Sequence, residues 1–216
     1  MAKTVTAAEM KERERAANEA GLLYIQMMEN AGRAAWKELK ARVPALRRLL
    51  IVAGKGNNGG DGFVMARVAA KEGVQVRVLL AEGEPKTADA KTNLARLAET
   101  AAEIVRDTEQ AAFGADAVVD ALYGTGFHGE LRPDGAAACA LMGRERERGA
   151  FVLALDLPSG ISADSGEVAE GAVQADATVT FDCTKPLHFA KASKPLCGAL
   201  VCADIGIGKA LGEHET

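Results

Sequence analysis

Short apolar runs that alternate with longer helical patterns constrain the fold of this chain more than any other feature of its sequence. Helical patterns at about 63–71, 88–99 and 134–148 fall between most of the runs. Strands that are apolar on both faces and alternate with helices predict an α/β fold, a three-layer α/β/α Rossmann-like sandwich with a mostly parallel central sheet. The expected strands are residues 49–53, 74–80, 103–106 (the weakest), 117–120, 151–156, 177–181 and 200–205.

Two further helices are expected before the first strand. Thr6 and Glu9 form a capping-box pattern, which predicts a helix to about Asn18. A second helix is expected from about Met27 to Arg42, where apolar residues recur at helical spacing. No linker long enough to divide the chain is evident. The sequence therefore predicts a single domain over residues 1–216, with N-terminal helices at about 6–42 and a Rossmann-like core at about 48–208.

Composition and charge narrow the classes of partner. The chain has 216 residues and a formal net charge of -4, which disfavours non-specific nucleic-acid binding. No apolar run approaches the roughly 18 residues of a membrane span, and the N-terminus lacks a signal-peptide pattern, so we expect a cytoplasmic protein. The four cysteines form no C-x-x-C pair and no zinc-ligand spacing, which predicts small buried hydrophobic residues rather than a metal or redox site.

A glycine-rich segment follows the first core strand, at 54–62. Ligands of parallel sheets bind at the carboxyl ends of strands, so this segment is the first place to search. Gly54, Gly56 and Gly59 match G-x-G-x-x-G, and Glu82 is an acid about 20 residues further on, as in dinucleotide-binding dehydrogenases. The polar stretch at 57–61 and the helical segment before the strand argue against a dehydrogenase.

Side chains within this segment suit ligand binding. The amide oxygens of Asn57 and Asn58 can ligate a cation or accept hydrogen bonds. Asp61 has two open roles: it caps a helix that begins near Gly62, or it contacts the substrate.

The next two expected strand ends also carry polar groups. Asp120 is followed by the turn Gly124-Thr125-Gly126, which is typical of a phosphate or ribose loop, although a turn without a ligand is the alternative. Asp156 ends an apolar strand, and its partial desolvation suits it to catalysis or cation binding. Ser159 follows, but G-x-S-x-G is absent, which argues against a serine hydrolase.

Basic residues near these strand ends have simpler expected roles. His128 and His188 are expected to be hydrogen-bonding loop residues, and His214 lies in a polar tail. Lys185 follows the expected strand 177–181, where a phosphate or carboxylate partner is one interpretation and a solvated lysine is the preferred one.

Several stretches, taken in order along the chain, resemble the YjeF N-terminal domain family. The combination of N-N-G-G-D-G with L-D-x-P-S-G is the specific part of the resemblance, and residues 181–189 depart from the usual family pattern. The matching stretches are 28–32, 54–62, 120–126, 155–160, 177–181 and 204–207.

The resemblance implies an NAD(P)H-hydrate epimerase, a metabolite-repair isomerase that interconverts the R and S forms of hydrated NADH and NADPH at C6 of the nicotinamide ring. It implies a potassium ion held by Asn58, Asp120 and Ser159, a homodimer that involves the N-terminal helices, and a fused or separate dehydratase. Hydrated NAD(P)H is then the substrate and not a cofactor, and Asp156 is the expected catalytic carboxylate. The implied substrate contacts are Asn57, Asn58, Gly59, Gly60, Asp61, Gly124, Thr125, Gly126, Phe127, His128, Gly129, Glu130 and Asp156.

Two other functions compete with the epimerase. The first is a non-catalytic nucleotide- or protein-binding module of the same fold, and the presence of Asn58, Asp120 and Asp156 argues for a live site instead. The second is the NAD-dependent dehydrogenase suggested by the glycine pattern, which would require hydride transfer.

Overall fold

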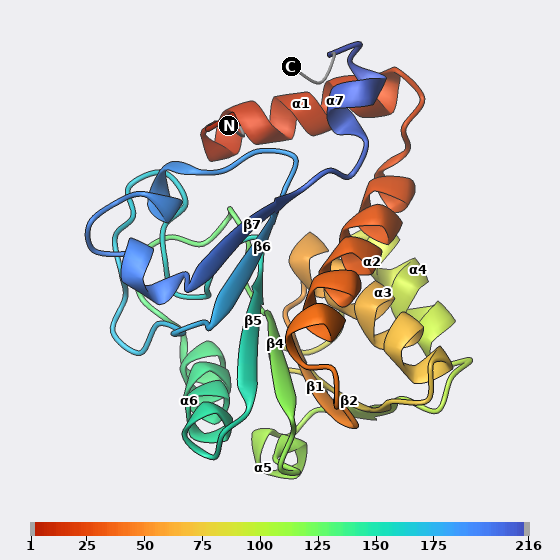
Figure 1. Cartoon of the computed structure of the whole chain (residues 1–216), viewed down its shortest axis with the longest axis vertical. Helices are drawn as coiled ribbons and strands as arrows, with labels where there is room; N and C mark the ends of the chain where they lie inside the picture. Colours follow the sequence, from red (N-terminus) through yellow and green to blue (C-terminus); the bar gives the residue numbers. More distant parts are fainter. Residues whose placement is uncertain (1–2, 214–216) are drawn as a thin grey trace.

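The computed structural model describes residues 3–213, so His214 and the other terminal residues of the predicted domain lie outside it. Its centre is a seven-stranded sheet in which all neighbouring strands are parallel, in the order β3-β2-β1-β4-β5-β6-β7 (Figure 1). The predicted three-layer α/β/α sandwich is therefore confirmed. The strands are β1 (Arg48–Ala53), β2 (Gln75–Leu80), β3 (Glu103–Val105), β4 (Ala117–Ala121), β5 (Phe151–Leu155), β6 (Ala177–Phe181) and β7 (Ala199–Ala203).

Helices cover both faces of the sheet (Figure 1). One face carries α2 (Tyr24–Arg42), α3 (Asn57–Lys71) and α4 (Ala88–Leu97), and the other carries α5 (Thr108–Ala111) and α6 (Pro133–Glu147). Successive residues of β1 alternate between the two cores, with Leu49 and Ile51 on the first face and Leu50 and Val52 on the second. Two further helices, α1 (Ala7–Glu19) and α7 (Ile207–Ala210), contact each other beyond the sheet.

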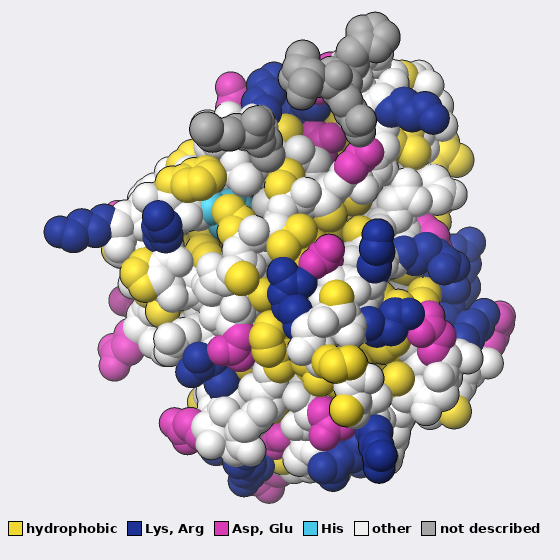
Figure 2. All heavy atoms as spheres, viewed as in Figure 1, with side chains coloured by type: hydrophobic (Ala, Val, Ile, Leu, Met, Phe, Trp, Pro, Cys, Tyr) yellow, Lys and Arg dark blue, Asp and Glu magenta, His cyan; other side chains and the backbone are white. Residues whose placement is uncertain are grey.

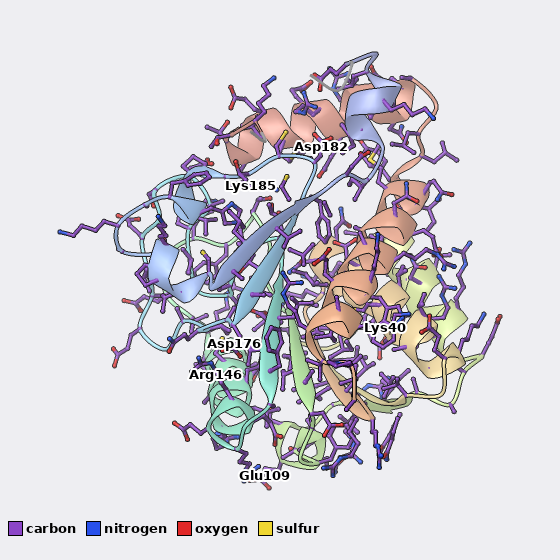
Figure 3. The ribbon with its side chains drawn as sticks, viewed as in Figure 1. Lys40, Glu109, Arg146, Asp176, Asp182 and Lys185 are labelled. Carbon is purple, nitrogen blue, oxygen red and sulfur yellow. The ribbon has the colours of Figure 1, made fainter. Side chains whose placement is uncertain are left out.

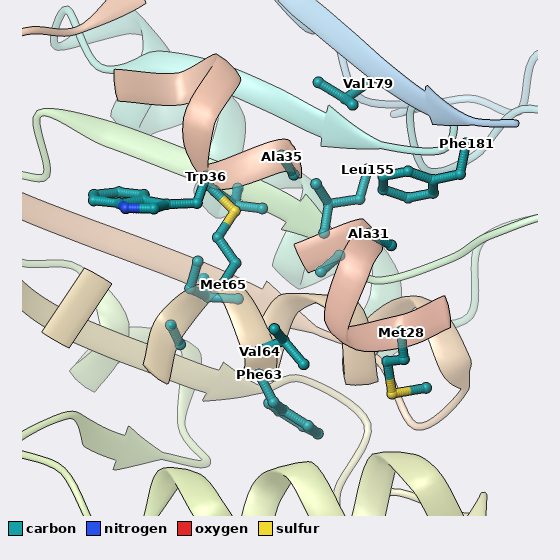
Figure 4. Close-up of a cluster of buried hydrophobic side chains, with 14 of the residues drawn as sticks. Met28, Ala31, Ala35, Trp36, Phe63, Val64, Met65, Leu155, Val179 and Phe181 are labelled. Atoms are coloured by element: carbon teal, nitrogen blue, oxygen red, sulfur yellow. The ribbon is translucent and has the colours of Figure 1, made fainter. Parts of the chain in front are cut away.

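The first core is built where α2 packs against α3 (Figure 4). Met28, Ala31, Ala35 and Trp36 supply the buried face of α2, at the helical spacing seen in the sequence. Small residues allow the close approach: a Cβ at Gly32 would lie 2.6 Å from the Cβ of Val64. This packing fixes the position of α3, whose N-terminus lies at the edge of the sheet where ligands are expected.

Helix α3 begins earlier than the sequence predicts. Glycines are poor helix formers, and the sequence predicts a helix that begins only near Gly62, with a cap as one of the two open roles of Asp61. Instead Gly56 is the N-cap, the helix starts at Asn57, and Asp61 lies inside it, so the capping role is wrong. Tertiary packing overrides the propensity: a Cβ at Gly59 would lie only 2.1 Å from the carbonyl oxygen of Gly54.

Smaller differences from the sequence expectations lie at element ends. Helix α2 begins at Tyr24 rather than Met27, and β7 ends at Ala203 rather than 205. The short helices α5 and α7 were not predicted. Two 3-10 turns follow β6, at Pro186–His188 and Lys194–Leu196. The first carries His188, which contacts the backbone of Asp156.

The cysteines and the surface follow the expected pattern of a folded α/β protein. Cys139, Cys183 and Cys197 are buried, as predicted, and Cys202 is half-buried. Figure 2 shows acidic and basic side chains interspersed over one face of the molecule. Within residues 3–213, no helix is long and apolar enough to cross a membrane.

The packing of α3 predicts opposite effects for two Gly→Ala substitutions. Gly59→Ala should lower the free energy of unfolding by about 2–3 kcal/mol, because its methyl group would overlap the Gly54 carbonyl oxygen. Gly143→Ala in α6 is the control: its Cβ would have no neighbour within 4 Å, so the better helix propensity should raise stability by up to about 1 kcal/mol. Urea unfolding followed by circular dichroism measures both. Equal effects would contradict the packing argument.

Candidate active site

A cleft of about 510 Å³ lies at the carboxyl ends of the central strands, between the start of α3 and the loops after β4, β5 and β6. It sits where the strand order reverses, because the chain passes from β1 to β2 on one side and later places β4 on the other. Gly59, Gly60 and Gly129 do not line it. The predicted substrate contacts that do are Asn57, Asn58, Asp61, Gly124, Thr125, Gly126, Phe127, His128, Glu130 and Asp156.

The glycine segment has the local geometry of the first half of the dinucleotide fingerprint. Gly54 turns tightly against the loop after β4, since a Cβ there would lie 1.8 Å from the carbonyl oxygen of Leu122. Gly56 has no neighbour within 4 Å of its Cβ position, so a ligand can approach its backbone closely. The first amides of α3 have no intrahelical acceptor and carry partial positive charge, which suits a phosphate.

The acidic half of that fingerprint is already occupied. Glu82 follows β2, where a dehydrogenase would bind the adenosine ribose. Its carboxylate accepts a 2.9 Å hydrogen bond from the Tyr123 hydroxyl, and Lys55 lies 3.4 Å away. Glu82 therefore braces the loop after β4, which removes the main support for a dehydrogenase.

The three predicted metal ligands meet around the backbone of Tyr123. Ser159 donates its hydroxyl to Asp120 Oδ1 at 2.6 Å and accepts from the Tyr123 amide at 2.9 Å. Asn58 Nδ2 donates to the Tyr123 carbonyl at 2.8 Å. Complete burial raises the pKa of Asp120 to about 6, although hydrogen bonds from the Ser159 hydroxyl and amide and from the Leu122 amide oppose the rise.

The donor set of this cluster fits a hard monovalent cation. Asn58 Oδ1 is buried and has no hydrogen-bond partner, and a buried amide oxygen left this way is costly unless something binds it. Ser159 Oγ also keeps a free lone pair after its two hydrogen bonds. All donors are oxygens and only Asp120 carries a charge, so one positive charge balances the site.

Asp156 lies at the end of β5 in a strained conformation. Its φ of 65° is in the left-handed region, which non-glycine residues adopt at a cost of about 1–2 kcal/mol. Its amide donates to the Val179 carbonyl at 2.7 Å. The carboxylate Oδ1 lies 2.9 Å from Thr180 Oγ1, and a Cβ at Gly124 would lie 4.0 Å from Oδ2. Oδ2 is therefore the oxygen on the side of the Gly124 loop.

Lys185 is buried, and the expectation of a solvated lysine is wrong. Only 1% of its surface is exposed, and Nζ lies 2.5 Å from Asp156 Oδ1. The loop after β6 runs beneath α1, where Thr184 pairs with Thr4, and this arrangement removes Lys185 from water (Figure 3). The available signal was topological: β5 and β6 are neighbours, so Asp156 and Lys185 follow adjacent strand ends.

His188 links the same two residues through their backbones. Its Nδ1 accepts from the Lys185 amide at 3.0 Å, so the neutral ring carries its proton on Nε2, which lies 3.0 Å from the Asp156 carbonyl oxygen. Burial lowers the pKa of His188 to about 4, against the opposing charge of Asp156. The sequence expectation of a hydrogen-bonding loop residue is confirmed, but its contact with the Asp156 backbone was not foreseen.

Two more carboxyl groups line the cleft near Asp156. Glu14 comes from α1 and Asp61 from α3. Burial, followed by the charge of Asp156, raises the pKa of Glu14 to about 7 and that of Asp61 well above its usual range. Sequence reasoning missed Glu14, because nothing in the pattern of the first helix indicates that it covers the strand ends. The cleft therefore combines an anchored carboxylate with two carboxyl groups whose pKa values are raised by burial.

Comparison with known proteins gives consistent matches. The pattern described as YjeF-related protein N-terminus matches residues 24–187. An NAD(P)H-hydrate epimerase from Pirellula staleyi is 41% identical over 207 residues, which cover 90% of this chain and 88% of that protein. A bifunctional NAD(P)H-hydrate repair enzyme Nnr from Coxiella burnetii is 38% identical over 202 residues, which cover 93% of this chain.

The lengths and the fold complete the comparison. This chain spans 41% of the length of the Coxiella burnetii protein, and 41% of a second bifunctional Nnr from Moorella thermoacetica. The crystal structure of the yeast protein ynu0 superimposes with a TM-score of 0.76 at 19% identity, covering 94% of this chain and 88% of that one. The yeast protein therefore shares the fold.

The lowered pKa of His188 predicts a pH-dependent contribution to stability. Between pH 4 and 6.5 the unfolded chain binds more protons at this residue than the folded chain, so the contribution is full above 6.5 and is lost as pH falls toward 4. The stability difference between wild type and His188→Gln should therefore shrink by about 2 kcal/mol from pH 7 to pH 4.5. Urea unfolding at both pH values measures it, and a difference that does not change with pH would refute a buried neutral imidazole.

Proposed function

The chain belongs to the family of YjeF-related N-terminal domains, and on that premise we propose that it is an NAD(P)H-hydrate epimerase. This isomerase would interconvert the R and S forms of hydrated NADH or NADPH at C6 of the nicotinamide ring. The observation that carries the proposal is Asp156, whose anchored carboxylate lines a cleft of about 510 Å³ together with the first residues of α3. The Pirellula staleyi relative, which matches 90% of the chain and bears this name, supports it.

The cleft suggests how the substrate lies. The pyrophosphate would bind the first amides of α3 beside the open backbone of Gly56. The turn at Gly124–Gly126, which also lines the cleft, would supply further amides and the Thr125 hydroxyl. The hydrated nicotinamide ring would then lie against Asp156, where its C6 faces a negative charge.

The chemistry needs no redox step. C6 of the hydrated ring carries a hydroxyl beside N1 and is therefore a hemiaminal. Loss of that hydroxyl as water, after it takes a proton, leaves a cation shared between C6 and N1, and a water molecule that adds to the opposite face and loses a proton gives the other epimer. Asp156 would stabilise the cation and orient the water, while Glu14 and Asp61, whose pKa values are raised by burial, would donate a proton to the departing hydroxyl.

Potassium is the cation that we propose for the cluster of Asn58, Asp120 and Ser159. It would supply a fixed positive charge that ties together the start of α3 and the loops after β4 and β5. A dehydratase, fused or separate, would consume the product epimer, which agrees with the bifunctional names of several relatives. The homodimer through the N-terminal helices and the cytoplasmic location remain predictions.

An epimerisation assay tests the function directly. We expect the purified protein, with potassium, to convert (R)-NADPH hydrate faster than the spontaneous reaction when a dehydratase specific for the S epimer removes the product. Asp156→Asn should lower the rate by about 100-fold or more, because the charge that stabilises the cation is lost. Asp116→Asn is a control carboxylate, since Asp116 binds backbone amides at the start of β1, away from the cleft. A folded wild-type protein without acceleration would favour the non-catalytic binding module.

Potassium should stabilise the folded protein specifically. At equal ionic strength we expect the Tm to be several degrees higher in potassium chloride than in choline chloride, because the ion binds only the folded cluster. Asn58→Ala should abolish the difference, since it removes the buried unpaired oxygen. Differential scanning calorimetry measures the effect. The same Tm in both salts for the wild type would mean that potassium does not bind there.

A further inference from the structure

Lys185 is the most deeply buried charged group in the cleft that the proposed chemistry leaves unused. A lysine is almost never fully buried unless its charge is paired. Its ammonium lies 2.5 Å from Asp156 Oδ1, 2.9 Å from Thr180 Oγ1 and 3.5 Å from the Phe181 carbonyl oxygen. These three acceptors match the three protons of an ammonium group, so Lys185 has none left for a substrate.

The contacts on Asp156 are unevenly shared between its two oxygens. Lys185 and Thr180 both act on Oδ1, while Oδ2 lies toward Gly124 and the cleft. A carboxylate held at one oxygen by two fixed groups cannot rotate freely about its side-chain bonds. The ion pair therefore determines which oxygen of Asp156 meets a ligand.

The backbone around this ion pair is fixed as well. The His188 ring contacts the Lys185 amide and the Asp156 carbonyl oxygen, both at 3.0 Å. The left-handed conformation of Asp156 is thus held at its carbonyl by His188 and at its amide by Val179. Lys185 and Asp156 form a pair whose main chains and side chains are both anchored.

Lys185 contacts only one of the carboxyl groups that line the cleft. Three of these groups are Glu14 from α1, Asp61 from α3 and Asp156 directly after β5. The titratable ring of His188 is also near, since its Nε2 lies 3.0 Å from the Asp156 carbonyl oxygen. Lys185 is bonded to Asp156 alone among the three. The buried ammonium therefore fixes the position of one of the three carboxyl groups and leaves the other two without this contact.

We propose that Lys185 is a positioning residue, which holds Oδ1 of Asp156 in place and so presents its Oδ2 to C6 of the hydrated nicotinamide ring. The inference rests on the proposed epimerase function. It also assigns a role to the segment at 181–189, which departs from the usual family pattern.

Three variants of the full chain test this role. Lys185→Met removes the charge and keeps most of the volume, whereas Lys185→Ala leaves a cavity. Lys40→Met is the control: Lys40 lies on α2, far from Lys185, and forms a surface ion pair with Glu72 (Figure 3). In the epimerase assay, Lys185→Met should lower kcat by about 100-fold with KM changed less than about threefold, because a displaced carboxylate impairs chemistry more than binding. Lys40→Met should behave as wild type.

Chemical rescue and a double variant separate positioning from a structural role. Added ethylammonium should raise the activity of Lys185→Ala at least tenfold, because it can donate hydrogen bonds in the cavity. Tetramethylammonium, which has no hydrogen to donate, should not raise it. The filled Lys185→Met variant should show no rescue. Adding Lys185→Met to Asp156→Asn should slow the enzyme no further, because the lysine acts through that carboxylate. Wild-type kcat in Lys185→Met, or rates that multiply in the double variant, would overturn the proposal.

A crystal structure of Lys185→Met keeps this test separate from that of the function. We expect the Asp156 carboxylate to turn away from its position beside Gly124, whether or not the wild type epimerises the hydrate. An unmoved carboxylate would refute positioning even in an active enzyme. Absence of wild-type activity together with a displaced carboxylate would refute the epimerase and leave Lys185 as the group that orients Asp156. If Lys185→Met fails to fold, Thr180→Val removes the second contact to Oδ1 and should displace the same carboxylate; an unmoved carboxylate there would overturn the proposal.

Discussion

The close contact between the start of α3 and the turn after β1 is the constraint on which the rest of the site depends. Gly59 rests against the Gly54 carbonyl, and Gly54 in turn rests against Leu122 in the loop after β4. These contacts bring Asn58 within reach of the Tyr123 carbonyl and therefore beside Asp120 and Ser159. Without glycine at these positions the helix would stand away from the sheet, and the oxygen cluster would not assemble.

The same contact explains why one segment can serve two purposes. The backbone of Gly56 at the start of α3 is open to the cleft, while Gly59 and Gly60 lie against packed neighbours. The polar side chains of the segment point to different surroundings: Asn58 to a buried oxygen cluster and Asp61 to the cleft. The proposed phosphate and cation sites and the observed helix packing are thus built on adjacent residues.

The sheet, its parallel strands and most of the polar groups at the strand ends could be predicted from the sequence, because each depends on the pattern of residues within a short stretch. Asp120 and Asp156 follow apolar runs, and the carboxyl ends of parallel strands necessarily share one edge. The start of α3 was misjudged because helix propensity is local, whereas the packing that overrides it involves residues from another loop. Lys185 was predicted to be solvated and Glu14 was missed for a similar reason. Their surroundings depend on where α1 and the loop after β6 pack in the fold, which cannot be predicted from one short stretch of sequence.

Helix α1 is attached in large part by polar contacts. Arg13 pairs with Asp182 at 2.9 Å and with Glu213, and the Ala7 amide donates to Asp164 at 2.7 Å. Only Met10 and Ala17 of this helix are buried. A helix held largely by polar contacts exchanges between docked and undocked populations more readily than one in the core. Since α1 supplies Glu14 and Met10 to the cleft, only the docked fraction would present a complete site, and the apparent affinity for any ligand would scale with that fraction.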